Sequence, residues 1–152
     1  MHVVLYQPEI PQNTGNIART CAVTGTALHL IEPLGFSLEE KHLKRAGLDY
    51  WQHLDLHVHG SLAELRALYP TEAFYYISTK GQKTYSAVTY GPDDFLVFGR
   101  ETAGLPSQVL TLNRDATLRI PMREGQRSLN LANSVALVLY EALRQQDFPS
   151  LW

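Results

Sequence analysis

Short apolar runs alternate with segments of helical spacing along the 152 residues of this chain. The runs predict strands at residues 3–6, 27–31, 74–77, 95–98 and 116–120, with a weaker strand at 56–58. Residues 74–77 and 95–98 are apolar throughout, which is typical of central strands covered on both faces. The alternation predicts one α/β domain over residues 1–152, with a mostly parallel sheet and helices on both faces.

Cap signals place the helices between these strands. Asn13 is a predicted N-cap for a helix over residues 14–24, and Gly25 is the predicted end of that helix. Ser37 and Ser61 each stand three residues before a glutamate, the spacing of a capping box, so a helix is expected after each serine. A further short helix is expected after Pro106, whereas residues 78–94 are expected to form one long loop.

The last helix, over residues 129–145, is apolar on most of its sides. The apolar side chains that nearly surround it are Leu129, Leu131, Ala132, Val135, Ala136, Leu137, Val138, Leu139 and Leu143. Such a helix needs cover on most sides, and one face of a domain cannot easily supply it. We therefore expect the helix either to be threaded into the core or to pack against a second copy in a homodimer.

The composition is that of an ordinary globular protein, with 45% hydrophobic and 18% charged residues. No apolar stretch is long enough to span a bilayer and no signal peptide opens the chain, so a cytoplasmic protein is expected. The lone Cys21 excludes an internal disulfide and is interpreted as a buried core residue. The six histidines lack the spacing of metal ligands, so no metal is expected.

Three segments carry the candidate chemistry. Residues 98–106 follow a predicted strand and contain two glycines, two opposite charges and a proline. Glycines allow a ligand to approach the backbone closely, and ligands bind at the carboxyl ends of parallel strands. The other two segments are residues 13–19 near the start, and residues 120–122 with 128–131 near the end. They match neither a phosphate-binding Walker loop nor a dinucleotide-binding fingerprint.

Each segment leaves alternatives open. Arg19 could clamp a phosphate in two parallel hydrogen bonds, or it could be a solvated surface residue. Glu101 could be a general base or could pair with Arg100. Ser128 reads as a helix N-cap that also touches a ligand rather than as a nucleophile, because no nucleophile-elbow motif surrounds it. Tyr140 could belong to the core or could lend its hydroxyl to a site at a subunit boundary.

Together the three segments resemble the motifs of the SPOUT class of RNA methyltransferases, in its SpoU-like branch. Residues 13–19 resemble the first motif, residues 98–106 the second, and residues 120–122 with 128–133 the third, in the same order. Residues 5–11 and 45–51 are similar to the TrmL group, the minimal methyltransferases that modify the ribose 2′-hydroxyl of the tRNA wobble nucleotide. The net charge of −2 argues against a nonspecific nucleic-acid coat protein but not against local basic patches.

The resemblance implies a C-terminal deep trefoil knot, a homodimer, and S-adenosylmethionine as the methyl donor. It implies methylation of cytidine or uridine 34 in the tRNA anticodon loop, with tRNA-Leu as the expected substrate. The positions implied for donor binding are Ile77, Thr79, Gly99, Gly104, Ile120, Ser128 and Leu129. The implied catalytic residues are Arg19, Asn16, Asn130 and Tyr140, and the RNA-binding ones are Lys44, Arg45, Lys80 and Arg127. Methylation of another RNA nucleotide and a non-catalytic RNA-binding role remain alternatives.

Overall fold

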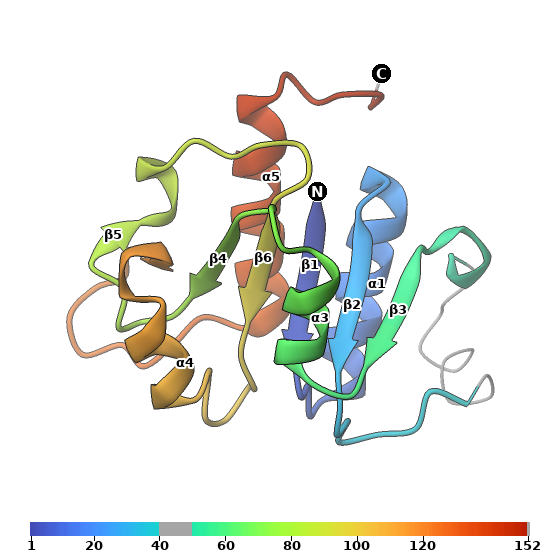
Figure 1. Cartoon of the computed structure of the whole chain (residues 1–152), viewed down its shortest axis with the longest axis horizontal. Coiled ribbons are helices and arrows are strands. Elements are labelled where there is room, and N and C mark those ends of the chain that lie inside the picture. The colour runs from blue at the N-terminus through green and yellow to red at the C-terminus, as the bar shows by residue number, and fades with distance from the viewer. Residues whose placement is uncertain (40–49, 152) are drawn as a thin grey trace.

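The computed structural model describes residues 1–39 and 50–151, and in them the strands form one parallel sheet. The strand order is β3-β2-β1-β6-β4-β7-β5, and Figure 1 labels all of these strands except β7. The strands are β1 (His2–Tyr6), β2 (Ala27–Ile31), β3 (Leu56–His59), β4 (Phe74–Ile77), β5 (Lys83–Thr84), β6 (Phe95–Phe98) and β7 (Thr117–Arg119). The helices are α1 (Pro11–Thr24), α3 (Leu62–Leu68), α4 (Ser107–Leu112) and α5 (Leu131–Gln145). Three short 3-10 turns complete these elements: η1 (Trp51–His53), η2 (Tyr85–Ala87) and η3 (Arg114–Ala116).

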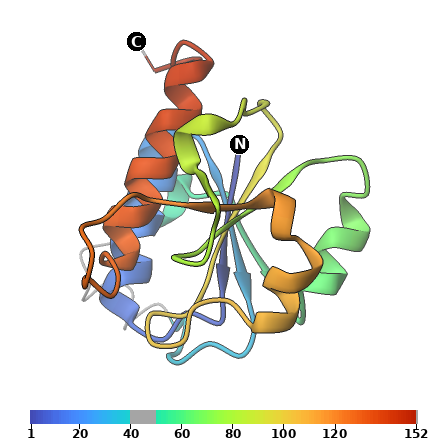
Figure 2. The same ribbon diagram turned by 90° about the vertical axis from the view of Figure 1, so that its left-hand side faces the viewer.

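Helices cover both faces of the sheet, as the sequence predicted. Helices α1 and α5 lie on one face, and α3 and α4 lie on the other (Figure 2). Successive side chains of one strand point to opposite faces of the sheet. Leu96 therefore packs with α1 and α5, whereas Val97 packs with α3. This double cover explains why residues 95–98 are apolar without alternation and fully buried.

The cap predictions are partly confirmed. Gly25 ends α1 in the left-handed conformation with φ 65°, and Ser61 caps α3 through a 3.0 Å bond from the Glu64 backbone N–H. Helix α1, however, begins at Pro11 rather than after Asn13, because a proline suits the first helical position. Asn13 therefore lies inside the helix and is buried, which frees its side chain for contacts with other segments.

Helix α5 also begins later than predicted. Its N-cap is Asn130, whose Oδ1 accepts bonds from the backbone N–H groups of Ala132 (2.9 Å) and Asn133 (3.3 Å). The prediction that Ser128 is the N-cap is wrong, because an asparagine nearer the first turn satisfies the free N–H groups of the helix. The loop over residues 78–94 contains the two-residue strand β5, which the sequence did not indicate. The helix predicted after Ser37 falls largely on residues 40–49, which lie outside the described residues.

The segment before β6 covers part of α5. Gln145 accepts a 3.0 Å bond from the Tyr90 backbone N–H and donates a 3.1 Å bond to the Val88 carbonyl. Together with α1 and the sheet, this segment buries Val135, Val138, Leu139, Ala142 and Leu143. Two large side chains of α5 stay outside this cover, since Leu137 is 43% exposed and Tyr140 is 44% exposed.

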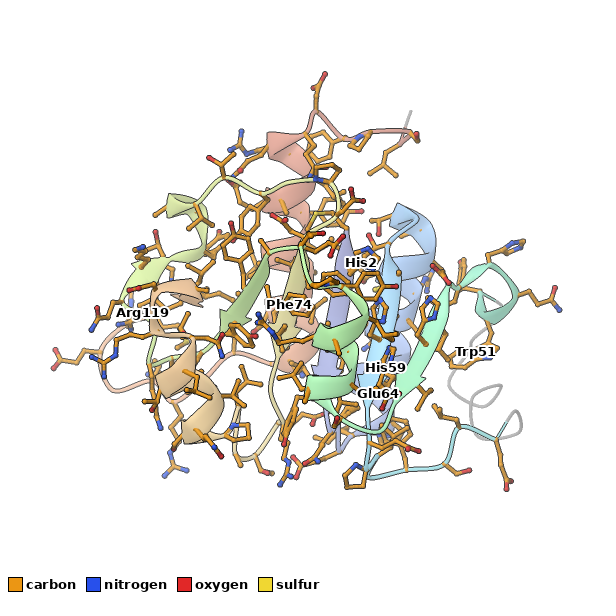
Figure 3. All side chains as sticks on the ribbon, viewed as in Figure 1. His2, Trp51, His59, Glu64, Phe74 and Arg119 are labelled. Atoms are coloured by element: carbon orange, nitrogen blue, oxygen red, sulfur yellow. The ribbon has the colours of Figure 1, made fainter. Side chains whose placement is uncertain are left out.

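The sheet carries a chain of hydrogen-bonded histidines on its α3 side. His29 is fully buried, and its two ring nitrogens lie 3.0 Å from ring nitrogens of His2 and His59. Figure 3 labels His2 and His59 on the sheet. Burial, followed by the neighbouring histidines, lowers the pKa of His29 to about 3, so its ring is neutral at physiological pH. No group of three or more metal-ligating side chains suited to an ion occurs in residues 1–39 and 50–151.

Two further expectations can be compared with the described residues. Cys21 is a core residue as predicted, since it is fully buried and its burial raises the pKa of the thiol to about 12. None of the helices in the described ranges is long and apolar enough to cross a membrane.

Candidate functional site

A pocket of about 590 Å³ lies at the carboxyl ends of β4, β6 and β7. Most of its wall comes from three stretches of chain within residues 77–80, 98–105 and 120–131, which are far apart in the sequence, and Ile10, Asn13, Leu110 and Ser134 complete it. It brings together every residue predicted to bind the donor, namely Ile77, Thr79, Gly99, Gly104, Ile120, Ser128 and Leu129. Lys80, Arg127 and Asn130, predicted for RNA binding and catalysis, line the same pocket.

A tight turn after β6 forms one wall of the pocket. Arg100 and Gly104 bond to each other across the turn through backbone bonds of 3.2 and 3.0 Å. A Cβ atom on Gly99 would stand 2.2 Å from the Gly104 carbonyl carbon and 2.3 Å from the Leu105 nitrogen. Gly104 has φ +66°, a conformation that L side chains rarely adopt. Gly99 is therefore needed because the turn leaves no space for a side chain, and Gly104 is favoured because of its backbone conformation.

Glu101 in this turn takes neither of the two roles considered from the sequence. Its carboxylate accepts bonds from the backbone N–H groups of Glu9 (2.8 Å) and Ile10 (3.0 Å) and from Asn13 Nδ2 (3.3 Å). Arg100 donates instead to Gln7 and lies over the Tyr6 ring, 5.9 Å from its centroid. A carboxylate whose oxygens already accept three N–H groups is poorly placed to act as a base.

Three of the four predicted catalytic residues are not on the pocket wall of their own chain. Asn16 and Arg19 are exposed on α1, beyond Asn13, and Tyr140 is 44% exposed on α5. Arg19 contacts Tyr50, with Nη2 donating a 3.1 Å bond to the tyrosine hydroxyl and its guanidinium 4.8 Å from the ring centroid. Asn130 is the one predicted catalytic residue that lines the pocket. Of the predicted RNA-binding residues, Lys44 and Arg45 lie outside the described residues.

The sequence did not indicate two contacts of this region. Glu9 was given no role, although it bonds to the glycine turn, and Tyr50 was expected to stack on an RNA base rather than to hold Arg19. Two hydrogen bonds from Thr102, one from its backbone and one from its side chain, lower the pKa of the Glu9 carboxyl below its usual value. Glu9 and Thr102 are 93 residues apart, so no local spacing could have indicated this contact.

A model of the SpoU rRNA methylase family matches residues 1–140. The chain belongs to this family. Among its relatives, the tRNA (cytidine(34)-2′-O)-methyltransferase of Methylovorus glucosotrophus is 50% identical over 147 residues, covering 96% of this chain and 96% of that protein.

Solved structures of the family superpose closely on this fold. A structure that concerns the 2-OH methylation of C/U34 on tRNA is 51% identical, has a TM-score of 0.89, and covers 96% of this chain and 95% of that chain. The SpoU methyltransferase AviRb of Streptomyces viridochromogenes, solved in complex with the cofactor AdoMet, is 27% identical with a TM-score of 0.83. That match covers 97% of this chain and 58% of AviRb. The family thus includes members that bind AdoMet.

Proposed function

We propose that this protein transfers a methyl group from S-adenosylmethionine to the ribose 2′-hydroxyl of nucleotide 34, cytidine or uridine, in tRNA. The observation that carries the proposal is the single pocket in which the glycine turn after β6, the end of β4 and the segment before α5 meet. The relative from Methylovorus glucosotrophus, named for this activity on cytidine 34, is 50% identical to this chain over nearly its whole length. That similarity favours the tRNA anticodon loop over another RNA.

The pocket fits the methyl donor in size and chemistry. Its volume of about 590 Å³ lies within the range of roughly 300–1,000 Å³ that is usual for pockets of small ligands and cofactors. At Gly99 the strand end and the returning turn lie so close together that a side chain would not fit between them. Ile77, Ile120 and Leu129 add apolar surface to the pocket wall. These residues, with Thr79, Gly104 and Ser128, would hold the donor, which supplies a methyl group bonded to a positively charged sulfur.

The side chains of this protein position the RNA and handle charge. The planar guanidinium of Arg19 clamps a phosphate next to the target ribose and stabilises negative charge that develops on the 2′-oxygen. Asn16, Asn130 and Tyr140 hold the ribose and the arginine in place by hydrogen bonds. Correct alignment of reacting groups can lower a barrier by roughly 7–11 kcal/mol. The hydroxyl proton leaves to an RNA phosphate or to water, because a guanidinium stays protonated at neutral pH.

The position of Arg19 supports a homodimer whose active site combines two chains. Arg19 and Asn16 are exposed on α1 and do not line the pocket of their own chain, although the proposed chemistry needs them there. Val23, one turn beyond Arg19, is 52% exposed, and Leu137 on α5 is 43% exposed. A second copy packed on this surface would bury these apolar side chains, and in the proposed dimer the Arg19 of that copy reaches the donor pocket.

Several finer features belong to the same proposal. Helix α5 is held between α1 and the segment that carries Val88 and Tyr90, which supports a knot in which the last helix passes through a loop of the chain. Lys44, Arg45, Lys80 and Arg127 bind the anticodon loop, whose unpaired bases can splay out of the stack. We expect tRNA-Leu to be the substrate and the cytoplasm, where tRNA is modified, to be the site of action.

Mapping the methylated nucleotide tests this proposal. The protein is incubated with methyl-labelled S-adenosylmethionine and with total tRNA from cells that lack its gene, and the product is digested and sequenced by mass spectrometry. We expect one labelled 2′-O-methyl nucleotide at position 34, first in tRNA-Leu. Label at another position or in ribosomal RNA would contradict the assigned substrate. Donor binding without transfer to any RNA would contradict the assignment as an enzyme.

A further inference from the structure

The carboxylate of Glu101 occupies the start of α1, although Glu101 belongs to the glycine turn on the pocket wall. Helix α1 has no side-chain cap of its own and no acidic residue in its first turn. Glu101, which is 91 residues from the N-cap residue Ile10, supplies the missing cap and the missing negative charge. Its oxygens accept the N–H groups of Glu9 and Ile10. A negative charge at this end of a helix is favoured by the free N–H groups and the helix dipole.

A second carboxylate makes the attachment reciprocal. Glu9, which precedes α1, accepts bonds at 3.0 Å from the Thr102 backbone N–H and at 2.9 Å from the Thr102 hydroxyl. The glycine turn is therefore fastened to the entry of α1 from both sides. Because Glu101 and Thr102 also line the pocket, the wall of the pocket and the start of α1 are parts of one hydrogen-bonded unit.

The same unit reaches the start of α5. Asn13 donates to Glu101 through Nδ2 and accepts a 3.0 Å bond from Asn130 Nδ2 at its Oδ1. Asn130 uses its own Oδ1 to cap α5. The orientation of each amide is therefore fixed by its neighbour, since turning Asn13 would bring two NH₂ groups together.

From these contacts we infer that Glu101 is a positioning residue. It fixes the start of α1 against the donor pocket and thereby sets where α1 presents Asn16 and Arg19. The inference rests on the proposed function, in which Arg19 acts on the RNA. Glu101 acts through α1 and not by proton transfer, because its oxygens are engaged by three N–H groups.

The two glutamates respond differently to loss of charge. In Glu101→Gln, an NH₂ group replaces an oxygen and faces at least one N–H donor in either orientation, so the attachment breaks. Glu9→Gln is the matched control, because its amide oxygen can still accept the Thr102 N–H while its NH₂ group donates to the Thr102 hydroxyl. Each substitution removes one negative charge from the same unit, and only Glu101→Gln places an NH₂ group against an N–H donor of the α1 entry.

Hydrogen exchange and turnover test the inference in the full-length protein. We expect amide exchange over residues 9–16 to be at least about tenfold faster in Glu101→Gln than in wild type, and unchanged in Glu9→Gln. At saturating donor, kcat should fall about 10- to 100-fold in Glu101→Gln and less than about threefold in Glu9→Gln. Exchange and kcat at wild-type levels in Glu101→Gln would overturn the inference, and so would equal losses in the two variants.

The readouts separate this inference from the proposed function. The difference in amide exchange between Glu101→Gln and Glu9→Gln is measured without RNA or donor. It therefore tests the role of Glu101 even if the wild-type protein transfers no methyl group. Glu101→Asp provides a second variant should Glu101→Gln not fold, because it keeps the charge but is shorter by one methylene. An aspartate at this position cannot reach the Glu9 and Ile10 N–H groups together. We expect Glu101→Asp to exchange faster than wild type over the same residues, and wild-type exchange there would overturn the inference.

Discussion

Gly99→Ala is expected to damage the donor pocket and the stability of the protein together. The added Cβ would stand 2.2 Å from the Gly104 carbonyl carbon, whereas ordinary contacts begin at 3.4 Å. The turn must therefore retreat by about 1 Å, and the atoms in its way are backbone. Overpacking of this kind costs typically 1–3 kcal/mol, and we expect the upper end because no flexible side chain can yield. About 3 kcal/mol corresponds to a fall in Tm of roughly 6–12 °C.

Calorimetry with S-adenosylmethionine and a thermal melt measure the two effects of Gly99→Ala. We expect the donor Kd to rise at least about tenfold, because the wall that shifts is the wall of the pocket. Gly104→Ala is the matched control, since its Cβ would meet nothing within 4 Å and only φ +66° opposes it. Its cost is about 1–2 kcal/mol. A Gly99→Ala protein with wild-type Kd and Tm would refute this steric reasoning.

Three further results are expected. Arg19→Lys keeps the charge but loses the forked guanidinium, so kcat in the methyl-transfer assay should fall at least about tenfold while the donor Kd in calorimetry is unchanged. The pKa of His29 is lowered from 6.5 to about 3 on folding, so its contribution to stability is complete above pH 6.5 and is lost as the pH falls toward 3. His29 alone should therefore lower the free energy of unfolding by about 2 kcal/mol between pH 7 and pH 5, and His2 and His59, whose pKa values burial also lowers, should add to this loss. In urea unfolding, His29→Gln should reduce the difference between the two pH values by about the His29 part. Cys21 should react with a thiol reagent only as the protein unfolds, because it is fully buried and burial raises its pKa to about 12. Rapid labelling of Cys21 without urea would contradict its place in the core.

Most of the fold could be predicted because the signals are local. Continuous apolar runs located the central strands β4 and β6, and Gly25 marked the end of α1. The exceptions arose where one local signal competed with another. Pro11 starts α1 before Asn13 can cap it, and Asn130 caps α5 in place of Ser128. Strand β5 has two residues, too few to produce a period in the sequence.

That the predicted donor-binding residues share one pocket could be predicted only through the resemblance to a known family, since the walls of the pocket lie far apart in the sequence. Nothing in the spacing of Ile77, Gly99 and Ile120 indicates that they share one pocket. The contacts of Glu101 were hidden for the same reason, because Ile10 and Glu101 are 91 residues apart. From the sequence, the only side-chain partner considered for Glu101 was its neighbour Arg100. Almost every residue has a backbone N–H group, so the sequence does not indicate which of them bonds to a distant carboxylate. That pairing becomes visible only in the folded structure.

Subunit complementation tests most directly whether one chain supplies the donor pocket and the other supplies Arg19. Arg19→Ala removes the clamp, and Thr79→Trp fills the pocket, with lost donor binding checked beforehand by calorimetry. Each variant alone should be inactive. After equal amounts are unfolded and refolded together, half of the dimers are mixed and each contains one intact site, so about a quarter of the wild-type methyl transfer should return. Methyl transfer that stays at the level of the separate variants would contradict an active site shared between two chains.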